Sequence, residues 1–471
     1  MTQGHGGAAA RPGMLSLAEL QVAAEAGEVD TVILAFTDMQ GRLQGKRLSA
    51  EYFFDEVAHH GAEGCNYLLA VDVEMNTVGG YAMSSWERGY GDFVLAPDLS
   101  TLRRVPWLPD TAMLLADLTW FDGDPVVASP RQILRAQTAR LAERGWTALA
   151  GTELEFIVYR DSYEQAADKG YAGLVPANQY NVDYSILGTS RIDPLLRRIT
   201  TGMGGAGMYV ESAKGECNLG QHEIAFRYAD AVTTCDNHSI YKTGAKEIAA
   251  QEGMSLTFMA KPNLREGNSC HIHLSLRTAV DGPGGRPGVG GEPFLAGDRP
   301  HGLSRLGEHF LAGQVAAMRE LTLLYAPNVN SYKRFVPGSF APTAVRWGVD
   351  NRTCALRLVG RGHALRVENR TPGGDVNPYL AIAGMIAAGL NGIDAELSLE
   401  DAYAGNAYAD DGPKVPHTLR DALELWEKSG LAREAFGDEV VSHYANYARV
   451  ELAAFDAAVT DWELRRCFER L

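Results

Sequence analysis

Two glutamates in the segment GTELEFIVY are the first residues of this chain whose spacing indicates chemistry. Glu153 and Glu155 alternate along the chain, so on a strand both carboxylates project from one face while Leu154 and Phe156 project from the other. Two carboxylates side by side repel each other unless a cation or a shared proton lies between them. Taken alone, the pair is equally typical of a half-exposed strand with solvated glutamates.

Further acidic and imidazole side chains follow in two short segments. Glu216 and Glu223 lie seven residues apart in GECNLGQHEIAFRY, around a Gly-Gln turn that can fold both back toward one point; a solvated surface loop is the alternative. His271 and His273 alternate in GNSCHIHLSL, so on a strand they share a face. A lone histidine is usually structural, but a pair on a strand after a Gly-Asn loop favours a metal-ligand role.

Arginines are concentrated in one later stretch of the chain. Between residues 334 and 370 the acids Asp350 and Glu368 stand among seven arginines, in a chain whose net charge is −16. Planar guanidinium groups suit bidentate recognition of phosphates and carboxylates, and a network of interface salt bridges is the alternative. The arginines are Arg334, Arg346, Arg352, Arg357, Arg361, Arg366 and Arg370.

These residue types together indicate one kind of chemistry. Carboxylate ligands with one imidazole suit Mg²⁺ or Mn²⁺. Phosphoryl transfer uses such metals to bridge and neutralise phosphates, and arginines to take up charge in the transition state. The spacing therefore predicts a metal-dependent phosphoryl-transfer enzyme.

The composition fits a cytoplasmic protein of two domains. A chain of 471 residues is longer than a single hydrophobic core usually supports. Fifty-nine acidic against 43 basic residues make non-specific nucleic-acid binding unfavourable, and no apolar run is long enough to predict a membrane span. Six cysteines without a CxxC pair favour a reducing compartment over a disulfide framework or a zinc ribbon.

The elements that must position these residues fall into two predicted domains after a disordered lead at residues 1–16. Residues 17–122 form a small β-rich unit with the strand TVILAFTD and a helix around AEYFFDEVAHH. The boundary lies near residues 122–129. Residues 123–471 form the larger domain. It begins with a helix in SPRQILRAQTARLAERG, with Pro just inside a Ser cap.

The larger domain mixes strands and helices. TALAGTELEFIVY is a predicted strand and TTCDNHSIYKTGAKEIAAQEG a predicted helix. The Gly/Pro-rich residues 277–301 predict a long exposed loop. Helical patterns run from about residue 378 to the end, with a break near AYADDGPKVPH.

The motifs, read in order, resemble the type I glutamine synthetase superfamily. They are GTELEF, GECNLGQHE, KPNLREGNSCHIHLSL, NVNSYKRFVPG, DNRTCALR and ALRVENRTPGGDVNPYLAIAGMIAAGL. The resemblance implies an α+β fold, with an N-terminal β-grasp domain and a catalytic domain built on a curved antiparallel sheet. It also implies a homo-dodecamer of two stacked hexameric rings with active sites at subunit interfaces.

The resemblance also implies ligands and partners. Glutamate, ATP and an amine would be the substrates, with two or three Mg²⁺ or Mn²⁺ ions. The implied metal ligands are Glu155, Glu216 and Glu223 beside the glutamate, and Glu153, His271 and Glu368 at the ATP phosphates.

Other positions match substrate contacts of the family. Gly267 matches the loop that touches the amino acid, Arg334 and Arg370 match its carboxylate binders, and Ser275 matches a nucleotide contact. Arg352 and Arg357 match the phosphate-side arginines and Arg366 lies beside the second metal, so that Arg352 and Arg334 are the implied catalytic residues.

Two departures from the family pattern concern the amine. Glutamine synthetases carry a catalytic Glu after the VPG of NSYKRFVPGSFAP, where this chain has Phe340. Their ammonium-binding Asp-Gly-Ser-Ser loop has no clear counterpart in GAEGCNYLLAVD. A less acidic, more apolar pocket suits an amine carrying an organic group. Glu63, Asn66 and Glu266 are candidate polar partners for it, although Glu266, where the family usually has Asn, equally fits a solvent-facing residue.

The resemblance is therefore narrowed to the γ-glutamyl-amine ligase branch, a placement also favoured by the tail DWELRRCFERL. Within it the chain is most similar to actinobacterial γ-glutamylethanolamide synthetases, so ethanolamine is expected ahead of polyamines and other monoamines. The rivals are a glutamine synthetase that uses ammonia, a catalytically silent structural paralogue and a nucleotide-binding module. Tyr408, near the place of an adenylylated tyrosine in some members, is interpreted as an ordinary loop tyrosine.

Overall fold

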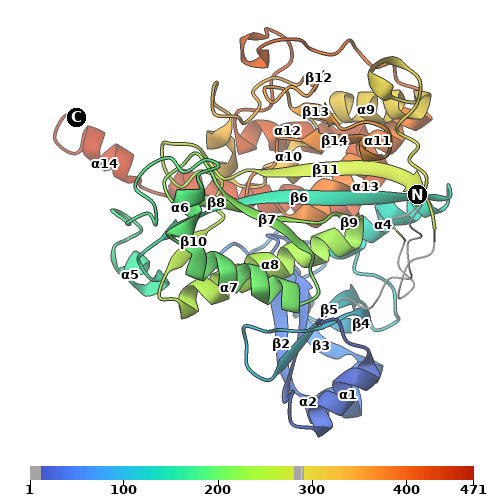
Figure 1. Cartoon of the computed structure of the whole chain (residues 1–471), viewed down its shortest axis with the longest axis vertical. Helices are drawn as coiled ribbons and strands as arrows, with labels where there is room; N and C mark the ends of the chain where they lie inside the picture. The colour runs from blue at the N-terminus through green and yellow to red at the C-terminus, as the bar shows by residue number, and fades with distance from the viewer. Residues whose placement is uncertain (1–11, 281–287, 289–290) are drawn as a thin grey trace.

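Two β-sheets of different size organise the computed structural model, which describes residues 12–280, 288 and 291–471 (Figure 1). The smaller sheet has the strand order β2-β1-β5-β4-β3, in which the β1–β5 pair is parallel and the other pairs are antiparallel. Its strands are β1 (Thr31–Thr37), β2 (Leu43–Ser49), β3 (Ala62–Cys65), β4 (Asp92–Arg104) and β5 (Thr111–Thr119).

Short helices close the small sheet. Helix α1 (Leu17–Glu25) begins at a capping box between Ser16 and Glu19. The predicted helix around AEYFFDEVAHH is present as α2 (Ala50–Tyr52), a π-helical turn over Phe53–Val57 and α3 (Ala58–His60).

The predicted disordered lead is too long at its C-terminal end. Residues 1–11 lie outside the described part of the chain, but residues 12–16 do not form a free tail. The Leu15 amide donates to the Leu102 carbonyl at 3.0 Å, and the Arg104 amide donates to the Gly13 carbonyl at 2.8 Å. These residues thus extend along β4, because a backbone pairing partner is available there.

The larger sheet carries the segments singled out in the sequence. Its order is β12-β13-β14-β11-β6-β8-β7, with β9 and β10 also paired to β6; β12–β13 is parallel and the other pairs are antiparallel. The strands are β6 (Trp146–Tyr159), β7 (Val210–Gly215), β8 (Gln221–Phe226), β9 (Ala229–Asp230), β10 (Ser255–Thr257), β11 (Cys270–Thr278), β12 (Trp347–Val349), β13 (Leu356–Val359) and β14 (Arg366–Asn369).

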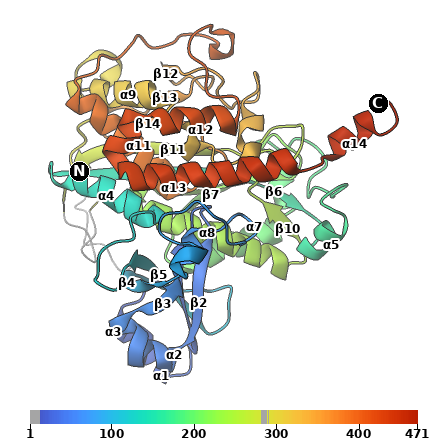
Figure 2. The ribbon, with the colours of Figure 1, turned by 180° about the vertical axis from the view of Figure 1, so that it is seen from behind.

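Helices surround the larger sheet (Figures 1 and 2). Figure 2 shows α13 crossing the back of the molecule and α14 projecting beyond its body. The predicted helix after the Ser129 cap and the later predicted helices are all present. The helices are α4 (Pro130–Ala142), α5 (Tyr163–Asp168), α6 (Ile186–Ser190), α7 (Asp193–Gly205), α8 (Ala231–Gln251), α9 (Arg305–Ala317), α10 (Thr322–Tyr325), α11 (Pro378–Asp394), α12 (Leu419–Lys428), α13 (Gly430–Ala457) and α14 (Asp461–Cys467).

The central helix α11 packs closely on α9 because small residues line the contact. A Cβ on Gly313 would lie 2.1 Å from the Ala388 carbonyl oxygen, and one on Gly392 would lie 2.1 Å from the His309 carbonyl oxygen. A Cβ on Gly389 would lie 2.0 Å from the Phe310 ring. Glycine at these positions therefore allows α11 to lie deep in the core beneath the larger sheet.

Residues 277–301 differ in part from the predicted exposed loop. Residues 281–287 and 289–290 lie outside the described residues, but the segment that returns from the loop packs on the sheet edge. The Phe294 ring lies 4.6 Å from the Trp146 ring, and Leu295 is buried. The glycines and prolines of this stretch predicted a fully exposed loop, but the segment EPFLAG also contains apolar residues. Burying them stabilises the packed position of the return segment.

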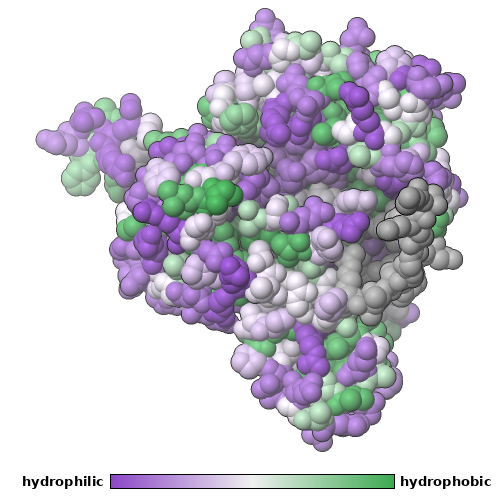
Figure 3. Space-filling model, viewed as in Figure 1, coloured by the Kyte–Doolittle hydropathy of each residue, from purple (hydrophilic) through white to green (hydrophobic). Residues whose placement is uncertain are grey.

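Hydrophobic side chains also remain on the surface. Figure 3 shows hydrophobic residues over α6 and on the projecting segment that carries α14. The exposed residues there include Ile186, Leu187, Trp462 and Phe468. Among the described residues, none of the helices has both the length and the apolar character that crossing a membrane requires.

A buried arginine joins the smaller sheet to helices α4 and α8 of the larger domain. Arg131 in α4 donates to Asp236 of α8 at 3.0 Å, to Asp117 of β5 at 2.6 Å and to Asp98 of β4 at 2.6 Å. Its side chain is almost fully buried. A guanidinium group can satisfy several carboxylates at once because its five N–H donors lie in one plane.

Replacing this residue tests its importance for stability. We expect Arg131→Met to lower the free energy of unfolding by about 3–5 kcal/mol, because buried carboxylates lose their counter-charge. Arg197→Met is the control, since Arg197 forms an exposed pair with Asp193 in α7 and should change stability by less than about 1 kcal/mol. Chemical denaturation of both variants is the measurement, and equal effects would contradict this role of Arg131.

Candidate active site

Strand register brings the predicted metal ligands together. Glu153 pairs with His271 across β6 and β11, and Glu155 pairs with Glu223 across β6 and β8. Glu368 of β14 lies opposite His273 of β11. Directly opposed residues project from the same face of a sheet, so these side chains converge although they are far apart in the sequence.

The first cluster consists of Glu153, His271 and Glu368, which offer ligand atoms within 4.8 Å of one another. The His271 Nδ1 lies 3.4 Å from a Glu153 oxygen and 3.7 Å from a Glu368 oxygen. Burial lowers the pKa of His271, which favours the neutral imidazole that a metal requires. Its Nε2 atom is buried and has no hydrogen-bond partner among the described residues.

The carboxylates of this cluster remain ionised. Burial acts to raise the pKa of Glu368, but the positive charges of His271, when it is protonated, and of the Arg370 guanidinium bring it down to about 2. Burial also acts to raise the pKa of Glu153. Hydrogen bonds from His271 and His273 to its carboxylate outweigh burial, so this pKa is lowered. Two carboxylates and a neutral imidazole fit Mn²⁺ or Mg²⁺.

The second cluster consists of Glu155, Glu216 and Glu223, also with ligand atoms within 4.8 Å of one another. Glu155 accepts hydrogen bonds from the Ser269 amide at 2.7 Å and from Gln221 at 3.0 Å. Burial, together with the nearby Glu153 and Glu155, raises the pKa of Glu223 to about 8. The same concentration of negative charge that makes Glu223 retain its proton also favours the binding of a metal cation.

Lys214 supplies a counter-charge to the second cluster. Its ammonium group contacts Glu216, lies 3.7 Å from Glu223 and lies 5.0 Å from the centre of the Tyr184 ring. The sequence contained a signal for this contact, because Lys214 precedes Glu216 by two residues at the end of a strand and so shares its face. We had not predicted it.

A third acidic group adjoins the second cluster. Asp183, Glu216 and Cys217 also offer ligand atoms within 4.8 Å of one another. However, burial and Asp183 raise the pKa of the Cys217 thiol to about 11. A neutral thiol is a poor ligand for Mg²⁺ or Mn²⁺. The predicted number of metals, two or three per chain, stays a prediction.

Arginines enclose the first cluster. Glu368 is fully buried and accepts hydrogen bonds from Arg357 at 2.8 Å and from Arg370. Arg366 donates to His273 at 3.1 Å, and the other ring nitrogen of His273 lies 2.9 Å from Glu153. His273 thus orients Glu153, whereas its alternation with His271 had favoured a metal-ligand role.

Arg352 and Ser275 are the remaining residues predicted to contact ATP. Arg352 lies on an exposed turn next to Asn351. Ser275 follows His273 by two residues on β11 and therefore projects from the same face as the imidazoles.

The predicted amino-acid pocket adjoins the second cluster. Arg334 is buried and donates to the Thr371 carbonyl at 2.9 Å and to the Ser269 hydroxyl at 2.8 Å. A Cβ on Gly267 would lie 2.3 Å from the Ala260 carbonyl oxygen and 2.7 Å from the Arg334 side chain. Gly267 therefore allows the loop to pass directly over Arg334.

The residues predicted to contact the amine do not all lie together. Phe340 is 53% exposed, has a φ of 60° and its carbonyl accepts a hydrogen bond from Arg370 at 3.4 Å. A Glu266 carboxylate oxygen is buried without a hydrogen-bond partner among the described residues. Glu63 lies on β3 of the small sheet. Asn66 is held by Ser84 at 2.6 Å and lines a separate cavity with Asp438 and Glu439.

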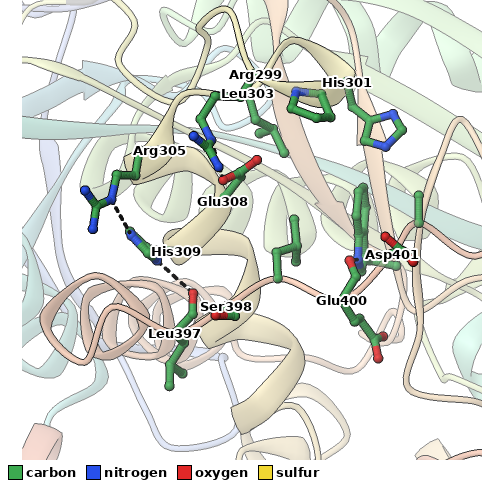
Figure 4. Close-up of a pocket in the computed structure, with 14 residues that line it drawn as sticks. Arg299, His301, Leu303, Arg305, Glu308, His309, Leu397, Ser398, Glu400 and Asp401 are labelled. Atoms are coloured by element: carbon green, nitrogen blue, oxygen red, sulfur yellow. Dashed lines mark hydrogen bonds and ion pairs between the residues drawn. The ribbon is translucent and has the colours of Figure 1, made fainter.

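A further cavity of about 290 Å³ lies between α9 and the segment around Glu400 (Figure 4). Two of its arginines contact other lining residues: Arg299 lies 2.6 Å from Glu308, and Arg305 donates to His309 at 3.3 Å. None of the predicted site residues lines it. This cavity is therefore distinct from the candidate active site.

Comparisons with known proteins agree with this geometry. Residues 127–467 match the family model "Glutamine synthetase, catalytic domain". The chain is 67% identical to γ-glutamylethanolamide synthetase GlnA4 of Streptomyces coelicolor, over 97% of this chain and 96% of the relative. It is 37% identical to a glutamate–isopropylamine ligase of a Pseudomonas species, over 94% of this chain and 95% of the relative.

Solved structures show the same fold. A complex of GmaS with ADP superposes with a TM-score of 0.82 at 28% identity, covering 95% of this chain and 99% of that chain. GmaS without ligand also gives a TM-score of 0.82, covering 96% of this chain and 99% of that chain. The predicted fold class is confirmed.

The chain belongs to the glutamine synthetase family. Its predicted placement in the glutamate–amine ligase branch of that family, and with it the prediction that the chain is an enzyme, is confirmed. The predicted domain boundaries and the roles of the individual site residues stay predictions.

The two clusters can be separated by metal titration. We expect the wild-type chain to bind two Mn²⁺ ions, Glu155→Ala to lose one and His271→Ala to lose the other, because each change removes a ligand from a different cluster. Electron paramagnetic resonance of free Mn²⁺ gives the stoichiometry without depending on activity. Glu211→Ala, which alters an exposed glutamate of β7, is the control. Two bound ions in both cluster variants would refute the assignment.

Proposed function

We propose that this enzyme uses ATP to join the γ-carboxylate of glutamate to a small organic amine, with ethanolamine favoured. The carboxylate is first converted to γ-glutamyl phosphate, and the amine then displaces the phosphate. The observation that carries the proposal is the convergence of two carboxylate clusters with buried arginines on one face of the sheet. The relatives named above and the ADP complex of GmaS support it.

The two clusters would hold divalent metals, which neutralise the phosphates and the carboxylate when bound. The arginines of the chain have separate roles around them. Arg357 and Arg370 hold Glu368 in place, and Arg352 stands exposed on the turn nearby, where it can reach a phosphate. Each terminal nitrogen of Arg334 donates one hydrogen bond within the chain. The remaining N–H groups of Arg334 can therefore contact the amino-acid carboxylate.

The choice of amine depends on Phe340. Ammonium needs acidic partners to be held and deprotonated, and an exposed aromatic ring provides none. An amine with a carbon chain gains apolar contact with such a ring. The hydroxyl of ethanolamine would need a polar partner, for which the buried Glu266 oxygen is suited.

Assembly and compartment are part of the proposal. Exposed apolar residues on α14 and just after it, Trp462 and Phe468, are suited to burial against another subunit and support the predicted dodecamer of two hexameric rings. Six free cysteines support a cytoplasmic enzyme.

An amine panel tests the choice of substrate. With glutamate and ATP, we expect ethanolamine to give faster phosphate release than ammonium, polyamines or other monoamines, and to yield γ-glutamylethanolamide by mass spectrometry. Phe340→Glu should raise the use of ammonium relative to ethanolamine, because it restores a carboxylate. Phe121→Glu, at an exposed phenylalanine near the domain boundary, should not. Efficient glutamine formation by the wild type, with no response to other amines, would overturn the proposal in favour of a glutamine synthetase.

Arg334 provides a separate test of glutamate binding. We expect Arg334→Lys to lower kcat/KM for glutamate by about tenfold or more, since a lysine keeps the charge but loses hydrogen bonds to charged and polar partners. Arg319→Lys, at an exposed arginine, is the control. Steady-state kinetics with saturating amine is the measurement, and unchanged kinetics would remove Arg334 from the site.

A further inference from the structure

Tyr408 is not the ordinary loop tyrosine that the sequence indicated. It lies in a short 3₁₀ turn, Ala407–Ala409, which is docked on the turn that carries Arg352. Thr353 accepts a hydrogen bond from the Ala407 amide at 2.9 Å, and Asn351 donates to the Gly405 carbonyl at 2.9 Å. The backbone of the segment that carries Tyr408 is therefore anchored to the turn that carries Arg352.

The hydroxyl of Tyr408 points inward. It is buried; the Phe340 backbone amide approaches its oxygen, but no described residue accepts the hydroxyl proton. Burial raises the pKa of Tyr408, while the guanidinium groups of Arg370 and Arg334 and the backbone of Phe340 oppose the rise. The hydroxyl is thus protonated at neutral pH, and the groups that influence it are residues of the predicted substrate pocket.

A second donor in this region has no acceptor either. The Nε of Arg370 is buried and unpaired among the described residues, although its terminal nitrogens contact Glu368 and the Phe340 carbonyl. Leaving buried donors unpaired is unfavourable. Two donors close to two guanidinium groups call for an anionic acceptor with more than one oxygen. A protonated amine would be repelled there.

We propose that the Tyr408 hydroxyl binds the substrate by donating a hydrogen bond to an oxygen of the glutamate γ-carboxyl group, beside Arg370. This inference rests on the proposed function and adds a residue to it. The γ-carboxyl group is common to every reaction of the enzyme, whichever amine follows. Tyr408 therefore acts in the binding and activation of glutamate and has no part in the choice of amine.

The variant Tyr408→Phe removes the hydroxyl and keeps the ring. We expect kcat/KM for glutamate to fall about tenfold or more, the size that a lost hydrogen bond to a charged group gives. The fall should be equal with ethanolamine and with ammonium as the amine. Tyr403→Phe, at a tyrosine of the same segment that lies over Arg346, is the control and should behave as the wild type.

Two further measurements separate substrate binding from a structural role. Positional exchange of oxygen isotopes in ATP, with glutamate present and no amine, reports the formation of the acyl phosphate and should slow by the same factor in Tyr408→Phe. Thermal unfolding of Tyr408→Phe without ligands should occur close to the wild-type temperature, because the hydroxyl makes only a marginal contact with the Phe340 backbone and its proton has no acceptor among the described residues. A structural hydroxyl would instead give a lower temperature.

The outcomes distinguish the inference from the proposed function. Wild-type exchange and kinetics in Tyr408→Phe would overturn the inference and leave the proposed function intact. A loss confined to one amine would overturn it too, by placing the hydroxyl at the amine. If the wild type accepted no amine yet showed isotope exchange that Tyr408→Phe slowed, the proposed function would fail while the contact with the γ-carboxyl group would stand.

Discussion

Electrostatic repulsion between carboxylates on one face of the larger sheet is the constraint on which the rest of the site depends. Glu153 and Glu155 project from β6, Glu223 lies opposite Glu155 on the neighbouring strand β8, and Glu368 approaches from β14, on the far side of β11. In a partly buried setting such a group must bind cations, take up protons or be surrounded by positive side chains. The chain shows the last two responses: Glu223 has a pKa raised to about 8, and lysine and arginine side chains contact Glu216 and Glu368. Metals are the remaining response, and they would supply the same charge from outside the chain.

This crowding is tolerated because the opposite face of the sheet is strongly held. Leu154 and Phe156 alternate with the two glutamates and are buried, and Phe156 packs on Phe258, which also contacts Tyr241 of α8. A slip of one residue in the register of β6 would turn these apolar side chains outward and the carboxylates inward. The apolar face therefore fixes the register, and the register fixes which acid faces which partner.

Much of this could be predicted from the sequence because it follows from local periodicity. Alternation placed Glu153 with Glu155 and His271 with His273, and the hairpin turn brought Glu216 to Glu223. The division of six ligands into two clusters depends on pairing between strands more than a hundred residues apart, which spacing alone does not encode; the family resemblance supplied it. The same periodicity also indicates the contact of Lys214 with Glu216, which was not predicted. The burial of Tyr408 is not indicated by periodicity, because it depends on hydrogen bonds from its loop to Asn351 and Thr353.

Unpaired buried polar atoms show how the site differs from the rest of the interior. Such atoms occur elsewhere in the described chain, for example at Thr37 and Gln314, so a single one carries little meaning. Around the first cluster, however, two donors lie among charged groups: the Nε of Arg370 and the hydroxyl proton of Tyr408. Both can donate to an anion. Because neither has an acceptor among the described residues, a carboxylate that bound there would add contacts at no cost to existing ones, while the Nδ1 of His271, between Glu153 and Glu368, is placed to bind a metal. The arrangement costs stability before binding and is suited to ligands of opposite charge that arrive together.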